Sequence, residues 1–418
     1  MKMKKTAVFL IVCALAILMS DGAAASGWDD ARSIAMAGSY TAIARGYDAV
    51  GFNPANLALS DRPGTTVQFF GIGSMINNNA FSVGDYKRFN GAYLTKSDKR
   101  EILDKIPDSG LEFKGNSGAS LLSFSYRSFA VSTTAEASGT GNISKDVVDL
   151  AFFGNKIGET IDVSEADAEG VIHADINFAY ARQVKSFQWG DVTAGLNFKY
   201  IRGFASFEVT EASANATTYE DGIDGDGRVV VRTATGGSGF GLDLGTAAKY
   251  SNDWTFSLGI KNLISRINWT EETEENEYTY NLISLTAENA DDDSTVVSDE
   301  IERSIGSFST SLAPQLNLGA SYEKGDFLFA SDVKFGLAKR AGATTTPELS
   351  FGTEYTGMGF LPLRGGFAFG GLHGASLGLG SGLKFSSFFI DFAWASSGTL
   401  LPTLGRGGAL AISSGLKF

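Results

Sequence analysis

The sequence contains very few of the residues that build disulfides, thiol sites and zinc sites. It has one cysteine, two histidines and seven prolines in 418 residues. Cys13 lies in the predicted leader, so the mature chain would have neither a disulfide nor a thiol nucleophile. His173 and His373 are far apart in the chain, and no G-x-S-x-G motif surrounds a serine near either one. We therefore expect no metal centre, no cofactor and no enzymatic activity.

Long hydrophobic runs are also missing from the body of the chain. After residue 25, no stretch approaches the ~18 uninterrupted apolar residues of a membrane-spanning helix, which excludes an ordinary helical membrane protein. Positive charge is scarce as well, because the formal net charge is −13. Nucleic-acid-binding proteins carry a basic surface, so we expect no nucleic-acid partner.

The N-terminus has the pattern of a secretory signal peptide. Three lysines among the first five residues precede the apolar run Ala7–Met19, and Ala23–Ala25 provides small residues for cleavage. The apolar run is shorter than the ~20 residues that a spanning helix needs. Residues 1–25 are therefore predicted to be a cleaved signal peptide of an exported protein.

From Thr65 onward the chain alternates with a period of two residues, which is typical of β-strands. In Val192–Tyr200, apolar residues at the even positions oppose Thr193, Gly195, Asn197 and Lys199. The segments Leu316–Tyr322, Phe388–Ala395 and Leu410–Phe418 repeat this division. A soluble β-sandwich has the same period, but no linker divides this chain into sandwich-sized domains. One apolar face and one small or polar face suit a strand between lipid and an aqueous lumen. Residues 65–418 are predicted to form an all-β, antiparallel, up-and-down membrane barrel.

The connections between these strands alternate in length, as in outer-membrane barrels with short periplasmic turns and longer outer loops. Helices are predicted over Lys96–Lys105 and Asp146–Phe153, inside two of the long connections. Two acidic stretches, Ala212–Gly227 and Glu271–Glu302, are expected to be outer loops. Six tight turns and seven longer connections give about fourteen strands. The tight turns are Arg127-Ser128, Lys185–Gln188, Ser251–Asp253, Glu323–Asp326, Thr356–Gly359 and Ser386-Ser387.

One stretch of the predicted mature chain, Ala31–Leu59, does not alternate. It is rich in alanine and glycine, has few charges and contains Asn53-Pro54, which fixes an extended or turn geometry at Asn53. Small residues can pack inside a larger structure without steric conflict. We predict that residues 26–64 form a small N-terminal hatch inside the barrel.

Ala31–Leu59 also resembles the FadL-like superfamily of outer-membrane proteins, which includes the long-chain fatty-acid transporters and the PorV-type relatives. The resemblance implies a plugged barrel in which hydrophobic molecules bind near the hatch and leave laterally through an opening in the wall. Asn56 stands where the family usually has glycine after Asn-Pro-Ala. The matching segments are Ala31-Arg32, Met36–Ala42, Asp48–Val50, Phe52–Ala55 and Leu57-Ala58.

Three groups of residues are candidate functional sites. Asn53, Pro54 and Ala55 are predicted to be the gate of the hatch. A kink of the wall at Gly236, Gly237 and Gly239 could form a lateral opening, although these glycines could equally mark bulges or close packing against the hatch. Weak candidates for calcium ligands are Asp221, Asp224 and Asp226, but the bidentate glutamate of an EF-hand is missing.

Two functions fit these features. The first is an outer-membrane channel that admits small hydrophobic or detergent-like molecules past the hatch. The second is a PorV-like platform without enzymatic activity, whose acidic outer segments bind a secretion or surface protein. Outer-membrane lipid is a partner in both cases. The acidic stretches are not an apolar entry surface, which favours the platform more than the hatch motif alone does.

Overall fold

The computed structural model describes residues 29–154, 156–162, 167–286, 289, 294–340 and 342–418. The predicted signal peptide, residues 1–25, lies outside the described residues.

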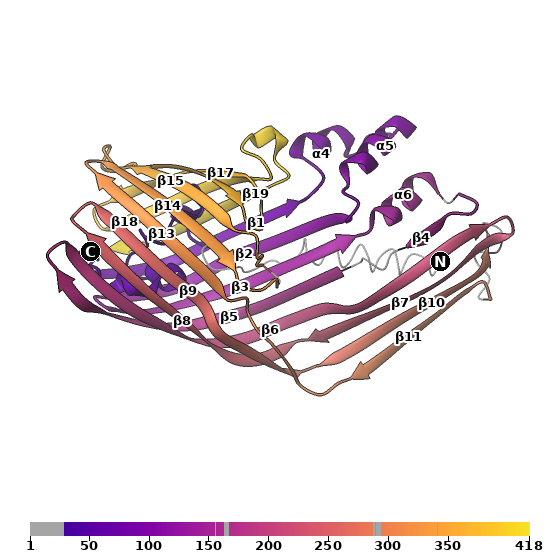
Figure 1. Ribbon diagram of the computed structural model, residues 1–418, viewed down its shortest axis with the longest axis horizontal. Helices are drawn as coiled ribbons and strands as arrows, with labels where there is room; N and C mark the ends of the chain where they lie inside the picture. Colours follow the sequence, from indigo (N-terminus) through magenta and orange to yellow (C-terminus); the bar gives the residue numbers. More distant parts are fainter. Residues whose placement is uncertain (1–28, 155, 163–166, 287–288, 290–293, 341) are drawn as a thin grey trace.

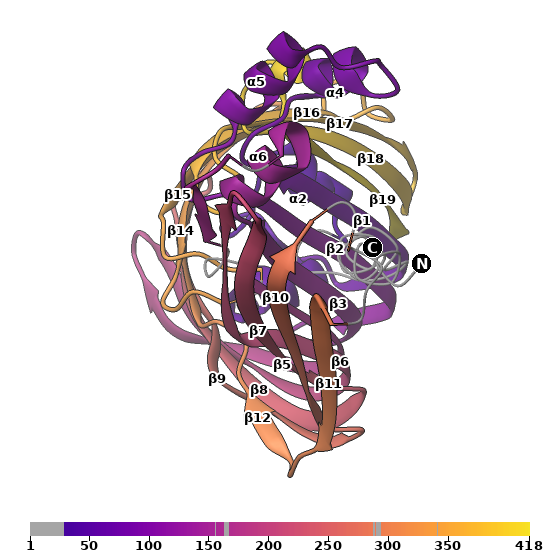
Figure 2. The same cartoon turned by 90° about the vertical axis from the view of Figure 1, so that its right-hand side faces the viewer.

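Fourteen antiparallel strands form a closed barrel, as the sequence predicts (Figures 1 and 2). Each wall strand pairs with the next wall strand along the chain, and β19 pairs with β1 to close the ring. The wall strands are β1 (Thr65–Asn78), β2 (Leu111–Tyr126), β3 (Phe129–Ile143), β5 (Asp167–Phe187), β6 (Gly190–Tyr219), β8 (Gly236–Tyr250), β9 (Trp254–Glu271), β13 (Gln315–Lys324), β14 (Phe327–Gly336), β15 (Glu348–Tyr355), β16 (Leu363–Gly370), β17 (Ser376–Phe385), β18 (Phe388–Ser397) and β19 (Gly407–Lys417).

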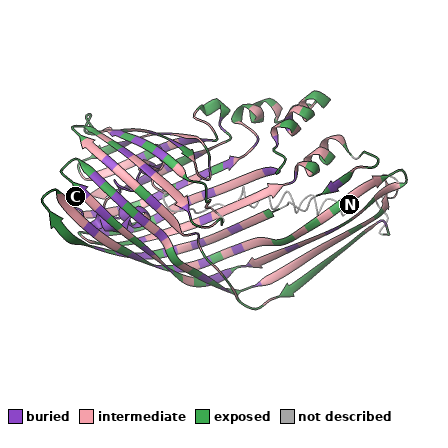
Figure 3. Ribbon diagram, in the orientation of Figure 1, coloured by how far each residue is buried: buried purple, intermediate pink, exposed green. Residues whose placement is uncertain are grey.

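Side chains alternate between the two faces of the wall, as Figure 3 shows by the bands of buried and exposed residues. On β6, Phe198 and Tyr200 are exposed, whereas Asn197 and Lys199 between them are buried. Apolar side chains on the outside and polar ones on the inside are the arrangement of a barrel in lipid. None of the described helices is both long enough and apolar enough to cross a membrane.

Aromatic residues gather at the end of the barrel where the turns are tight. Ring centroids are 4.7 Å apart in the pair Phe187 and Trp189 and in the pair Trp254 and Tyr322. Aromatic girdles of this kind lie at the membrane–water interface of outer-membrane barrels. The tight-turn end therefore has the features of one membrane boundary.

Short helices cover the opposite end, where the connections are long. The helix predicted over Lys96–Lys105 is α5, and its N-terminus is fixed by a capping box between Thr95 and Asp98. The second predicted helix is α6 (Lys145–Phe153), which begins one residue earlier than expected. Two further helical segments, α4 (Val83–Phe89) and η2 (Pro402–Leu404), were not predicted.

The described residues of the two acidic stretches fold mainly as strands, so the prediction that they are loops is wrong there. Residues 287–288 and 290–293 of the second stretch lie outside the described residues. β6 continues beyond the wall and pairs with β7 (Gly222–Ala234), which in turn pairs with β10 (Glu274–Leu285) and then β11 (Val296–Ser304). We call residues 206–219 of β6, together with β7, β10 and β11, the extension (Figure 1). The extension also contains β-branched and aromatic residues such as Val229–Val231, Tyr278 and Tyr280, which favour strands despite the acidic composition. Two short strands, β4 (Thr160–Asp162) and β12 (Phe308–Thr310), complete the sheet.

Candidate functional site: the hatch and the adjoining cavity

The segment predicted to be a hatch folds into three short helical turns inside the barrel. These are α2 (Ala31–Ala35), α3 (Asp48–Phe52) and η1 (Pro54–Ala58). Asp30 begins α2, because its carboxylate accepts hydrogen bonds from the backbone N–H groups of Arg32 and Ser33. The domain boundary between hatch and barrel stays a prediction.

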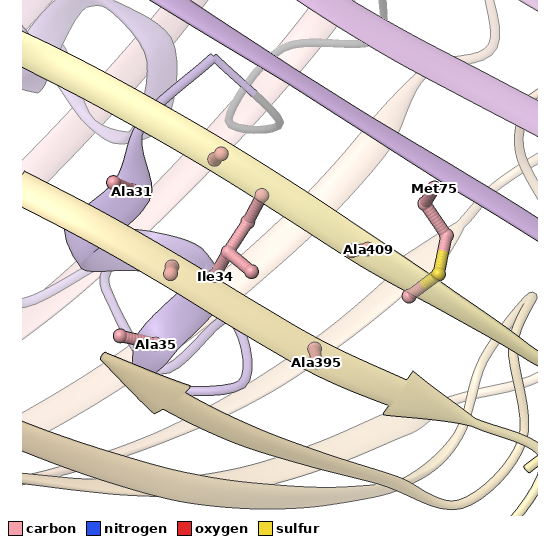
Figure 4. Packing of buried hydrophobic residues seen from close by; sticks show 8 residues of the cluster. Ala31, Ile34, Ala35, Met75, Ala395 and Ala409 are labelled. Atoms are coloured by element: carbon pink, nitrogen blue, oxygen red, sulfur yellow. The ribbon is translucent and has the colours of Figure 1, made fainter.

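Small apolar residues bring α2 close to the wall (Figure 4). Ile34 and two alanines of α2 pack against Met75 of β1, Ala395 of β18 and Ala409 of β19. Alanine side chains are short, so the helix backbone lies near the strands. The hatch is consequently held by tight packing and not by a thick layer of large side chains.

Glycines of the wall make this close approach possible. At Gly195, a Cβ atom would lie 2.5 Å from the backbone N of Ala55, and at Gly366 it would lie 2.5 Å from the backbone C of Met36. Any side chain at these positions would displace the hatch backbone. Wall glycines whose Cβ would meet a hatch atom within 3 Å are Gly71, Gly195, Gly245, Gly259, Gly319, Gly352, Gly366, Gly378 and Gly380.

A buried ion pair fastens the first turn of the hatch. Arg32 donates through Nε and Nη2 to the carboxylate of Glu354 on β15, at 2.8 and 2.7 Å. Arg364 on β16 donates to the same carboxylate, and also to Asp391 on β18 at 2.6 Å. Two arginines therefore share one glutamate, which satisfies charges that burial would otherwise destabilise.

Further along the hatch, one wall carboxylate holds the backbone. Oδ2 of Asp332, on β14, accepts hydrogen bonds from the N–H groups of Tyr40 at 3.0 Å and Thr41 at 2.9 Å. Lys334 on the same strand donates to the carbonyl of Gly38. Charge-assisted contacts to backbone groups position a loop that has little side-chain bulk of its own.

Asn53 connects the hatch to the opposite part of the wall. Its Nδ2 donates to the carbonyls of Thr246 on β8 at 2.9 Å and Leu258 on β9 at 3.2 Å. Its Oδ1 accepts from the N–H of Ala55 at 3.0 Å, and Pro54 opens the helical turn η1. The carbonyl of Ala55 in turn accepts a hydrogen bond from the Thr193 hydroxyl at 2.9 Å. The role of Asn53, Pro54 and Ala55 as a gate stays a prediction.

Two carboxyl groups of the hatch have opposite environments. Burial and, to a smaller extent, the neighbouring Asp48 carboxylate raise the pKa of Asp30 to about 7. Burial also acts to raise the pKa of Asp61, but Arg45 and Lys249 reverse this effect and lower the pKa to about 2. Arg45 Nε lies 2.9 Å from the Asp61 carboxylate, and Lys249 Nζ lies 2.6 Å from it. The two ends of the hatch therefore respond differently to pH.

A cavity of about 200 Å³ separates part of the hatch from the wall. Its apolar lining comes from residues such as Ile34, Phe52 and Met75, and its polar lining includes Lys261 of β9. Lys261 is buried and forms no ion pair with any residue that the structure describes. The cavity can thus accommodate a molecule with an apolar body and a hydrogen-bond acceptor. Its remaining charged or histidine lining residues are Glu136, His173, Lys334, Glu348 and His373.

The surroundings of His173 differ from those of the histidine in a serine triad. His173 lies on β5 with Nδ1 2.9 Å from Asp175 and Nε2 3.7 Å from Glu136, so carboxylates face both ring nitrogens. His373 lies in the connection between β16 and β17. A serine triad needs a hydroxyl at one nitrogen of the histidine, and at His173 a carboxylate takes that place.

The remaining sequence candidates are separated from the hatch. Asp221 lies in the turn at the tip of the extension, while Asp224 and Asp226 are on β7, where they accept hydrogen bonds from the Ser284 N–H and the Asn215 side chain. In the described part of the chain, no group of three or more His, Cys, Asp and Glu side chains is placed to hold a metal ion.

The glycine-rich start of β8 is paired on both sides. Gly237 and Gly239 have partners on β6 and on β9, and register shifts with β9 occur at Gly236/Gly237 and at Leu242/Leu244. The shift at Gly236/Gly237 is a β-bulge, and a lateral opening there stays a prediction.

Sequence reasoning missed the wall residues that hold the hatch. Glu354, Asp332 and Lys334 each place a charge on the lumen face of a wall strand. A charge on the lumen face was a usable signal, because it must find a partner inside the barrel. The partner itself could not be read from the sequence.

The closed ring and the apolar outer face define a fourteen-stranded membrane β-barrel, with α2, α3 and η1 in its lumen. A family model described as "Family of unknown function (DUF5723)" matches residues 54–235 and 222–391, and the chain belongs to this family. No curated protein matches the chain.

Solved structures with the same fold are FadL-family transporters. The Ralstonia pickettii toluene transporter TbuX matches with a TM-score of 0.55 and 14% identity, over 94% of this chain and 99% of that chain. A Pseudomonas aeruginosa FadL homologue matches with a TM-score of 0.54 and 12% identity, over 95% and 100%. The Pseudomonas putida toluene transporter TodX matches with a TM-score of 0.50 and 12% identity, over 92% and 96%. The predicted FadL-like fold is therefore confirmed.

Proposed function

We propose that this protein is an outer-membrane channel that admits small hydrophobic molecules past the hatch. The observation that carries the proposal is the way the hatch is seated. In the described residues it is held in the lumen by glycine contacts, hydrogen bonds and the ion pair of Arg32 with Glu354, beside a cavity whose lining is partly apolar. Such contacts can open and close again without breaking the wall.

The comparisons support the class of cargo. TbuX and TodX are toluene transporters with this fold. A molecule of that kind would contact Ile34, Phe52 and Met75 in the cavity. Lys261 suits a molecule that also carries a hydrogen-bond acceptor, because a buried ammonium without a partner is unfavourable. The function is non-enzymatic.

The test loosens the hatch in two independent ways. Asn53→Ala combined with Pro54→Ala removes the hydrogen bonds to β8 and β9 together with the fixed turn. Gly195→Ala places a methyl group against the backbone of Ala55. The matched control is Gly365→Ala, where the nearest atom to the new Cβ lies at an ordinary 3.7 Å.

Each purified variant is reconstituted into liposomes, and the entry of a fluorescent hydrophobic probe is timed. We expect entry at least fivefold faster than in the parent for both hatch variants and unchanged entry for the control. If the parent admits the probe no faster than protein-free liposomes and both variants match the parent, the channel assignment is wrong.

A further inference from the structure

Strand β11 is a free edge of the extension. It pairs with β10 over nine residues and with no other described strand (Figure 1). Eight of its nine residues, Val297–Ser304, are exposed. A free strand edge presents a row of N–H and C=O groups that fits another extended chain.

The backbone hydrogen bonds define which groups point outward. The N–H of Ile305 donates to the carbonyl of Thr273, and the N–H of Ile283 donates to the carbonyl of Thr295. Hydrogen-bonded pairs alternate along an antiparallel ladder, so the odd-numbered residues of β11 bond to β10. The even-numbered residues therefore direct their N–H and C=O groups away from β10. At Ser298 and Glu302 no described group accepts the N–H, whereas at Glu300 the Asp299 carboxylate accepts it.

The carboxylates near the free edge of β11 indicate which kind of partner would bind there. Glu300 and Glu302 project from one face of β11, and Glu274 of β10 is on the same face by register. None of these three carboxylates has an ion pair within the described residues, whereas Glu277 on the other face is paired with both Arg228 and Arg303. Unpaired carboxylates at alternate positions match lysine or arginine at alternate positions of an incoming strand.

We propose that the free edge of β11 binds an extended cationic polypeptide segment, which adds to the sheet as a further strand. This interaction is independent of whether the channel conducts. A second copy of β11 is the wrong partner, because antiparallel self-pairing would place carboxylates opposite carboxylates. The even-numbered backbone groups supply the hydrogen bonds, and Glu300 and Glu302 supply the preference for positive charge.

The experiment uses the full chain in lipid nanodiscs and a nine-residue peptide of alternating lysine and valine. A second peptide has the same sequence and charge but is methylated at every backbone nitrogen, so it cannot donate to β11. We expect the first peptide to bind and the methylated peptide to bind at least tenfold more weakly. Binding should weaken further as salt is added.

Variants separate the backbone contribution from the charge contribution. Ser298→Pro removes one outward N–H but keeps the ladder to β10, since proline is tolerated where the N–H of an edge strand faces solvent. Its matched control is Ser298→Ala, which keeps that N–H. We expect binding at least tenfold weaker for Ser298→Pro, within twofold of the parent for Ser298→Ala, and at least tenfold weaker for Glu300→Lys combined with Glu302→Lys.

Hydrogen exchange provides a second measurement on the parent protein. The amides of Ser298 and Glu302 should exchange quickly in the free protein and slowly in the complex, whereas odd-numbered amides of β11 are protected in both. Failure of the parent to bind the first peptide overturns the proposal. Equal binding of both peptides, with Ser298→Pro unaffected, also overturns it, since this result shows charge adsorption without strand addition.

Discussion

The hatch and the extension both depend on charged side chains, but the charges have different surroundings. In the hatch, Arg32 reaches Glu354 across 322 residues of sequence, and the glutamate side chain is only 8% exposed. In the extension, Arg303 pairs with Glu277 of the adjacent strand, and the arginine side chain is 47% exposed. A buried charge requires its partner, whereas an exposed charge can exchange its partner for water.

This difference shows what each region can do. The contacts between the hatch and the wall join distant parts of the chain. A substitution in the hatch therefore also removes contacts of the wall strands. The extension is a ladder of neighbouring strands, so its charges can vary without loss of the barrel. Our proposals of a gate for the hatch and of a partner surface for the extension use this difference.

The largest expected effect is on the buried ion pair of the hatch. Glu354→Ala leaves Arg32 without its carboxylate and removes one of the two partners of Arg364. We expect a loss of about 3–5 kcal/mol in the free energy of unfolding, as for other buried charges deprived of their partner. Urea titration in micelles measures this loss.

The matched control comes from the extension. Glu300→Ala removes an exposed carboxylate without an ion pair in the described residues and should change stability by less than about 0.5 kcal/mol. If Glu354→Ala and Glu300→Ala lowered the free energy of unfolding equally, the contrast between the buried charges of the hatch and the exposed charges of the extension would be wrong.

An intermediate effect is expected from Asp30, whose pKa is raised to about 7 by burial and by Asp48. A carboxyl group with a raised pKa contributes stability that is complete below about pH 4 and is lost as the pH rises through 7. Asp30→Asn mimics the protonated acid, so the variant should lack this dependence. Urea titrations between pH 4 and 8 should show that the parent loses stability relative to the variant as the pH rises. The equilibrium constant of unfolding of the parent should increase by at most about tenfold per pH unit.

Parallel curves for the parent and Asp30→Asn would contradict the buried, uncharged state of this carboxyl group. The Asp61 carboxylate does not interfere in this range, because its pKa is lowered to about 2 and its contribution is lost only in more acidic solution.

Among the ion pairs, the smallest effect is expected in the extension. Arg303→Ala removes an exposed arginine from Glu277, which keeps its contact with Arg228 at 2.6 Å. We expect a loss of about 0.2–1 kcal/mol, measured as faster hydrogen exchange of the β10–β11 ladder. An effect as large as that of Glu354→Ala would show that the extension is held as firmly as the hatch.

The alternation of residues from Thr65 onward predicted the wall correctly, because the side chains of a strand face lipid and lumen in turn. Tight turns such as Arg127-Ser128 and Ser386-Ser387 predicted the strand count. Acidic composition predicts loops at the two acidic stretches, but β-branched and aromatic residues such as Thr217 and Tyr278 favour the strands that form there.

The contacts of the hatch could not be predicted in the same way. Arg32 could have met any of several carboxylates on the lumen faces, and only closure of the ring brings Glu354 beside it. Gly195 and Gly366 are unremarkable in the sequence, yet the hatch backbone occupies the space where their side chains would lie. Long-range proximity of this kind depends on the register and closure of all fourteen strands.

The sequence by itself determined the class of the molecule, because side-chain periodicity and turn chemistry are local properties of the chain. The tertiary structure alone decided which wall residues hold the hatch, what lines the cavity and which strand edge remains free. These features depend on distances between residues hundreds of positions apart, and those distances exist only when the barrel has closed.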